Sequence, residues 1–210
     1  YNKRKIKKKP TSWWDLWDPQ YKDRVSMLDN VRDCISVAMQ LLGIPQTTSD
    51  PEDFRKIREL LVKQKPLVKQ YSSASYLNSL VAGEIDLAMT WSGDLFQTAR
   101  ENPDLDYVIP KEGTYMWVDC LAIMRGSRHR ADTLRLIDYL LEPAVAAGIA
   151  NSVRYATPNQ AAQPQVDKVL LKDPRVYPTP ALMKQLQLHH VLDSEQSELW
   201  SQTWADVKVA

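Results

Sequence analysis

The feature that most constrains this chain is an alternation of short strand-like runs with helical segments of about ten residues. We expect strands over 24–28, 67–71, 85–90, 107–110 and 116–124, and helices over 31–42, 73–82, 94–100 and 131–141, with further helices beginning at Pro51, Pro143 and Ser194 and a short one within 158–180. Strands that alternate with helices form βαβ units, whose strands pair in parallel. The sequence therefore predicts an α/β protein with a mostly parallel sheet flanked by helices.

Helix boundary signals support this pattern. Apolar residues recur at helical spacing over 31–42, and Gly43 follows them as a stop. Asp50 stands before Pro51 and two further acids. This predicts a helix start capped by Asp50, with acidic residues at the positive end of the helix dipole. These boundaries fix where two of the helices are expected to begin and end.

Charge and composition exclude several classes of protein. Lys and Arg number 27 and Asp and Glu 26, a net charge of +1, which argues against nucleic-acid binding over the whole surface. The six glycines are too scattered to form a phosphate-binding loop. The longest uncharged stretch, residues 34–49, contains Gly43 and Pro45 and does not resemble a membrane span.

The chain begins with Tyr1 rather than Met, and no apolar signal segment precedes it. We therefore expect a piece of a longer or processed chain. A basic run occupies residues 3–9. It is interpreted as part of a solvated connector over residues 1–10, with a patch for nucleic acid or anionic membranes as the alternative.

No catalytic or metal-binding motif occurs in the sequence. His189 and His190 are adjacent, so they point in different directions, and we expect surface or packing roles for them. Cys34 and Cys120 are too few for a disulfide scaffold or a zinc cluster. Two separate buried thiols are favoured over one bridge, and the redox compartment stays open.

Aromatic residues beside carboxylates are the most informative pattern. Trp91 and Asp94 follow one expected strand, Trp117 and Asp119 would share a face of another, and Asp33 follows a third. Ligands of open α/β sheets bind at the carboxyl ends of the strands. An indole face attracts ammonium groups and carboxylates accept their hydrogen bonds, so the pattern suits a small organic cation.

Each of these residues also has a purely structural interpretation. A Trp in a strand usually belongs to the core, and Asp29, Asn30 and Asp94 could all be helix caps. The binding hypothesis therefore depends on the residues as a set.

Further segments, spread over nearly the whole chain, support the binding hypothesis. They are Thr11-Ser12-Trp13-Trp14-Asp15-Leu16-Trp17, Leu28-Asp29-Asn30-Val31-Arg32-Asp33, Tyr71-Ser72-Ser73, Trp91-Ser92-Gly93-Asp94, Pro110-Lys111-Glu112-Gly113, Trp117-Val118-Asp119, Tyr139-Leu140-Leu141-Glu142-Pro143, Tyr155-Ala156-Thr157-Pro158-Asn159-Gln160-Ala161-Ala162, and Trp204-Ala205-Asp206-Val207-Lys208. In order and spacing the chain resembles the periplasmic spermidine/putrescine-binding proteins of bacterial ABC importers.

The resemblance implies a type II periplasmic-binding-protein-like fold of two α/β lobes with the ligand clamped between them. Residues 11–115 and 164–210 would form the C-terminal lobe, and residues 116–163 would belong to the N-terminal lobe, most of which is absent from this sequence. That predicts exposed apolar surface, a swapped assembly or a partner chain.

The resemblance also implies ligand-binding roles for seven residues, with no cofactor, metal or catalytic group. They are Asp33, Ser73, Trp91, Asp94, Trp117, Asp119 and Tyr155. Asn30 falls where spermidine-type members carry an acid, and His189 falls near their glutamine. Asp94 together with a neutral Asn30 favours the putrescine type, although the choice between putrescine and spermidine stays open.

The implied function is capture of a polyamine and its delivery to ABC permease subunits of the inner membrane, without an enzymatic step. The protein would be periplasmic or lipid-anchored, with a signal peptide in its full-length form and no nucleic-acid partner. The alternatives are a polyamine-sensing regulatory module, a binding protein for another small cation, and a nucleic-acid binder that uses the basic run.

Overall fold

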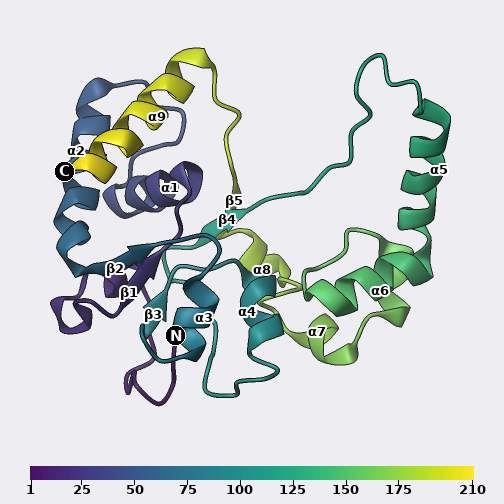
Figure 1. Cartoon of the computed structure of the whole chain (residues 1–210), viewed down its shortest axis with the longest axis horizontal. Coiled ribbons are helices and arrows are strands. Elements are labelled where there is room, and N and C mark those ends of the chain that lie inside the picture. Colours follow the sequence, from purple (N-terminus) through teal and green to yellow (C-terminus); the bar gives the residue numbers. More distant parts are fainter.

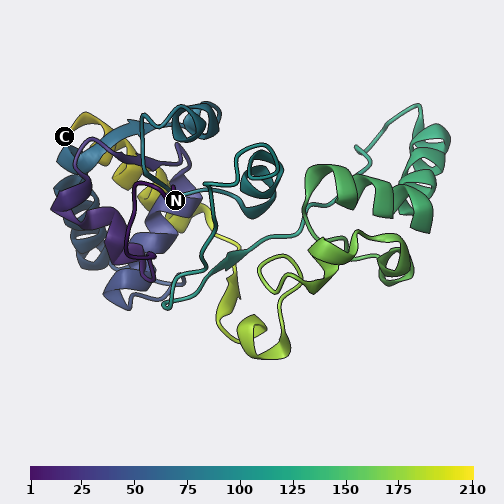
Figure 2. The ribbon, with the colours of Figure 1, turned by 90° about the horizontal axis from the view of Figure 1, so that it is seen from below.

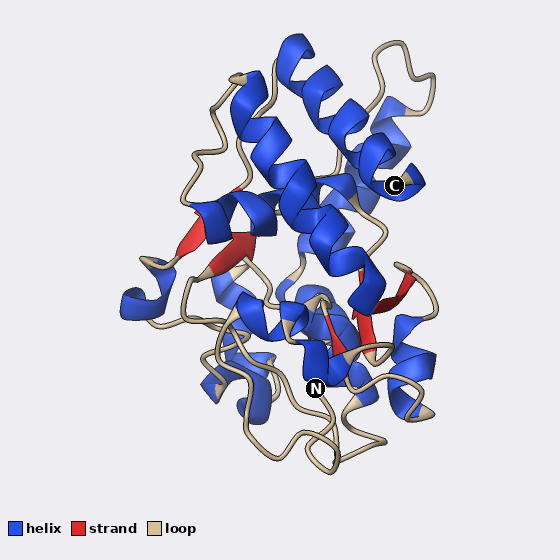
Figure 3. Cartoon of the chain, turned by 90° about the vertical axis from the view of Figure 1, so that its left-hand side faces the viewer, coloured by secondary structure: helices blue, strands red, loops and turns tan.

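The computed structural model describes residues 1–210 and contains two bodies that lie side by side (Figures 1 and 2). In the larger body a three-stranded sheet has the order β2-β1-β3, and both pairings are parallel. Its strands are β1 (Val25–Met27), β2 (Val68–Tyr71) and β3 (Leu87–Ala88). The predicted α/β class with a parallel sheet flanked by helices is confirmed, although the strands are short beside the helices (Figure 3).

Three long helices, α1 (Val31–Leu42), α2 (Pro51–Gln64) and α9 (Ser194–Val209), pack together over this sheet. The predicted boundary residues act as expected. The Asp50 side chain accepts a hydrogen bond from the Glu52 amide at the start of α2, and Gly43 ends α1 in the left-handed conformation with φ +68°. The apolar faces of these helices form the core around Ile57, Leu61 and Trp200.

Shorter helices complete the larger body. They are η1 (Trp13–Trp17), η2 (Pro19–Tyr21), η3 (Lys65–Leu67), α3 (Tyr76–Val81) and α4 (Ser92–Thr98). The N-terminal segment is anchored rather than wholly solvated, because Tyr1, Asn2 and Ile6 are buried while the lysines of the basic run are exposed. No helix of the chain combines the length and the apolar character that a membrane crossing needs.

Two crossing strands lie between the bodies: β4 (Thr114–Met116) pairs in parallel with β5 (Leu186–Leu188). Gly113, just before β4, has φ +86°, and a Cβ built on it would lie 2.2 Å from the Gln185 carbonyl oxygen. Only glycine therefore allows the two chain segments to approach so closely.

The smaller body consists of α5 (Arg130–Leu141), α6 (Pro143–Val153), η4 (Gln160–Gln165) and α7 (Lys168–Lys172), and α8 (Pro180–Met183) leads back to β5. Its core contains four alanines together with Val166, Leu170 and Val176. Helix α5 buries none of its residues, and Leu134, Leu136 and Tyr139 are exposed. Exposed apolar surface was expected for this part of the chain.

Three predictions were wrong in this region. Residues 117–124 form no strand, because β5 ends at Leu188 and offers them no further backbone to pair with. Residues 107–110 are also irregular. Cys120 is exposed rather than buried, since its segment runs unpaired toward α5, whereas Cys34 is buried as expected and both thiols are free.

Candidate functional site

A cavity of about 440 Å³ lies where the two bodies meet, large enough for a small organic molecule. Its wall combines residues from β4, from the segment after α6 and from the segment before α8. They are Ser92, Tyr107, Ile109, Thr114, Tyr115, Met116, Trp117, Val118, Asp119, Tyr155, Ala156, Thr157, Pro158, Gln163, Arg175, Val176, Tyr177, Pro178 and Leu186. Three of the predicted residues, Trp117, Asp119 and Tyr155, are on this wall.

Trp117 and Tyr155 form an aromatic corner. Their ring centroids are 5.8 Å apart and their planes meet at 71°, an edge-to-face arrangement. Trp117 remains 41% exposed, so its indole face is open to a ligand. The corner can pack against a methylene chain or a cationic group.

Asp94 lies behind this corner, in the first turn of α4. Its Oδ1 accepts a hydrogen bond from the Tyr155 hydroxyl and its Oδ2 accepts one from the Tyr76 hydroxyl, each at 2.9 Å. Burial is the main cause that raises the pKa of both tyrosines, so both stay protonated and can donate. Asp94 therefore holds Tyr155 in place and does not itself line the cavity.

Gly93 explains how Tyr155 comes so close to α4. A Cβ built on Gly93 would lie 2.3 Å from two atoms of the Tyr155 ring. Any larger residue would displace the ring and break its hydrogen bond to Asp94.

The charges of the cavity wall favour a cation. Asp119 is exposed on the wall and has no ion-pair partner in the protein. The one cation of the wall, Arg175, is already neutralised by Asp173 at 2.7 Å and Asp106 at 2.6 Å. The hydrogen bond with Asp173 is the largest cause that raises the pKa of Arg175. The uncompensated charge is therefore that of Asp119.

Asp33 belongs to a neighbouring cluster. It lies in the first turn of α1, and its Oδ1 is 3.7 Å from Nε2 of His189. The His189 ring stacks on Tyr115, with centroids 4.9 Å apart, and Tyr115 lines the cavity. Asp33 is thus separated from the cavity by His189 and Tyr115.

Ser73 and Trp91 lie at the carboxyl edge of the sheet, off the cavity wall. The Ser73 hydroxyl is buried without a hydrogen-bond partner. Trp91 precedes α4 and packs against the core beside the sheet. The structure therefore brings Asp94, Trp117, Asp119 and Tyr155 together and leaves Asp33, Ser73 and Trp91 outside this group.

Sequence reasoning assigned no role to Tyr76, Tyr115 or Arg175. Tyr76 donates a hydrogen bond to Asp94, and Tyr115 lies between the cavity and His189. The charge of Arg175 is neutralised by two carboxylates. Their partners are distant in sequence, so no local pattern pointed to them. The strand expected to present Trp117 and Asp119 is absent, although both residues reach the wall.

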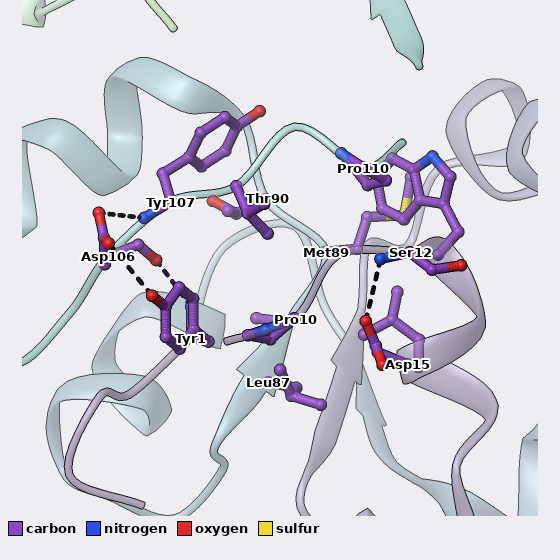
Figure 4. Close-up of a pocket in the computed structure, with 14 residues that line it drawn as sticks. Tyr1, Pro10, Ser12, Asp15, Leu87, Met89, Thr90, Asp106, Tyr107 and Pro110 are labelled. Atoms are coloured by element: carbon purple, nitrogen blue, oxygen red, sulfur yellow. Dashed lines mark hydrogen bonds between the residues drawn. The ribbon is translucent and has the colours of Figure 1, made fainter. Parts of the chain in front are cut away.

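A second hollow lies between the N-terminal segment and β3 (Figure 4). Its volume is about 50 Å³, room for a few water molecules rather than for an organic ligand. The larger cavity is therefore the candidate binding site.

Comparison with known proteins identifies the family of this chain. The sequence model of the family described as "Bacterial extracellular solute-binding protein" matches residues 1–179. The chain belongs to this family. Its members are transport binding proteins rather than an enzyme family, and they act outside the cytoplasm.

Individual relatives of this extracellular solute-binding protein are polyamine-binding proteins by name. It is 36% identical over 168 residues to the spermidine/putrescine-binding periplasmic protein of Salmonella typhimurium, covering 80% of this chain and 48% of that protein. It is 30% identical over 209 residues to a putrescine/agmatine-binding protein of Pseudomonas aeruginosa, covering 92% of this chain and 57% of that one. The chain thus spans about half the length of these relatives.

The fold agrees with a solved structure. A spermidine/putrescine ABC transporter substrate-binding protein from Streptococcus pneumoniae superposes with a TM-score of 0.85 and 25% identity, covering 100% of this chain and 65% of that one. The predicted periplasmic-binding-protein-like fold is confirmed.

Proposed function

We propose that this protein captures a polyamine, putrescine or spermidine, and delivers it to the permease of an ABC importer. The observation that carries the proposal is the cavity between the bodies, where Trp117 and Tyr155 form an aromatic corner beside the unpaired carboxylate of Asp119. The names of the relatives support the polyamine class.

The chemistry of the wall matches this ligand. A protonated diamine carries two ammonium groups joined by an apolar tether. Each hydrogen bond to a charged group contributes about 1.5–3 kcal/mol net, and a cation–π contact about 0.5–2 kcal/mol. Asp119 would hold one ammonium group and Trp117 would cover the tether. We assign the second end of the site to Asp33, Ser73, Trp91 and Asp94 on the family resemblance alone, since none of them lines the cavity.

Closure would take place at the crossing strands. We propose that the larger body belongs to one lobe and the smaller body, which includes α7, to the other, so that β4 and β5 mark the hinge. The Tyr155 hydroxyl then joins the lobes by its bond to Asp94. A hinge that closes around the ligand presents a distinct surface to a permease. Such a protein would be periplasmic or anchored to the membrane by a lipid.

Isothermal titration calorimetry with putrescine and spermidine tests the proposal on the natural full-length protein. We expect Asp119→Ala and Trp117→Ala each to weaken putrescine binding at least tenfold without unfolding the protein. Matched controls are Asp138→Ala, an exposed aspartate of α5, and Trp14→Ala, whose indole is 45% exposed outside the cavity. Unchanged affinity in both cavity variants would remove these residues from the site, and absence of polyamine binding would refute the function.

A further inference from the structure

His189 connects the carboxylate of Asp33 to the wall of the cavity. It follows β5 directly, and its Nε2 lies 3.7 Å from Oδ1 of Asp33 while its Nδ1 lies 3.4 Å from Oγ of Ser36. Its ring stacks on Tyr115 with the planes 9° apart, and Tyr115 lines the cavity. A charge on this imidazole therefore acts on Asp33 and on the cavity wall together.

Asp33 is the one carboxylate within 4 Å of a His189 ring nitrogen. Tyr115, on β4, has its pKa raised to about 12 by burial, so its hydroxyl stays neutral and donates to the Ser36 carbonyl. Arg32, on α1, is a permanent cation that donates to the carbonyl of His190. The side chains of His189 and Asp33 are only 19% and 16% exposed, so solvent screens their interaction weakly.

We propose that His189 is a proton-dependent competitor for the cationic ligand, an inference that rests on the proposed polyamine function. The neutral imidazole leaves Asp33 its full negative charge. The imidazolium pairs with Asp33 and places a positive charge behind Tyr115, which opposes a dication in the cavity.

The sign of the pH dependence follows from the charge that each kind of group carries. Alkyl ammonium groups and carboxylates keep their charge between pH 5.5 and 7.5, whereas histidine changes its charge in this range. Polyamine affinity therefore falls as the pH falls. The chain has three histidines, and His129 and His190 are natural controls because neither lines the cavity or forms an ion pair with Asp33.

Calorimetric titration of the full-length protein with putrescine at pH 5.5, 6.5 and 7.5 tests the proposal. We expect the dissociation constant to rise about tenfold from pH 7.5 to 5.5. His189→Gln, which keeps a polar amide without a titratable proton, should bind equally well at all three values, whereas His190→Gln and His129→Gln should keep the full pH dependence.

Two outcomes would overturn the inference while polyamine binding stands: affinity that does not depend on pH, or a pH dependence that persists in His189→Gln. Absence of putrescine binding at every pH would instead overturn the proposed function and the inference with it.

Discussion

The larger body buries Leu61 and Trp200 almost completely among its helices, whereas α5 of the smaller body buries none of its residues. The core of the smaller body consists largely of alanines, whose small side chains bury little apolar surface. The larger body can therefore be stabilised by its own packing. The smaller body depends more on what joins it to the larger one, including the crossing strands, the contact of Tyr155 with α4 and the ion pair of Arg175 with Asp106.

The largest expected effect comes from replacing a buried leucine of the larger body by alanine, compared with the same change at an exposed leucine of the smaller body. Leu61 is 0% exposed and Leu136 is 55% exposed. We expect Leu61→Ala to lower the free energy of unfolding by about 3 kcal/mol, because it leaves a cavity in a closed core. Leu136→Ala should change it by less than about 0.5 kcal/mol. Urea denaturation followed by tryptophan fluorescence measures both, and equal losses would contradict the contrast between the bodies.

A smaller effect is expected at the joint between the bodies. Gly113→Ala adds a methyl group 2.2 Å from a backbone oxygen at φ +86°, and should cost about 2 kcal/mol or more. Gly126→Ala has a similar φ of +81° but meets nothing within 4 Å, so it should cost only the backbone strain of about 1 kcal/mol.

Thermal unfolding of the two glycine variants separates the cost of backbone strain, which both variants carry, from the cost of steric overlap, which only Gly113→Ala carries. If both lose the same stability, the close approach of Gly113 and Gln185 does not hold the bodies together.

Local signals predicted the parts of the fold that depend on local interactions. The boundaries of α1 and α2 follow from Gly43 and Asp50, which act on their own helix ends. The strand expected over 116–124 forms only at Met116, because a strand also needs a neighbour and β5 ends before it could pair with residues 117–124. The sequence pattern carried no information about where β5 would stop.

The candidate site was likewise predictable only where it depends on residues that are close in sequence. Trp117 and Asp119 were singled out as an aromatic–acid pair, and they do reach one cavity. The link through Tyr76, Asp94 and Tyr155 joins residues 18 and 61 positions apart in sequence, so only the folded chain reveals it. The ligand-binding roles of all seven residues remain predictions.

The smallest expected effect concerns the hydroxyl by which Tyr155 reaches across to α4. Tyr155→Phe keeps the ring over Gly93 and removes the 2.9 Å hydrogen bond to Asp94. We expect a loss of about 1 kcal/mol in the free energy of unfolding, because a carboxylate oxygen loses its donor. Tyr139→Phe, on the exposed face of α5, is the matched control and should have no effect. Equal stability of the two variants in urea denaturation would show that this hydrogen bond does not help to join the bodies.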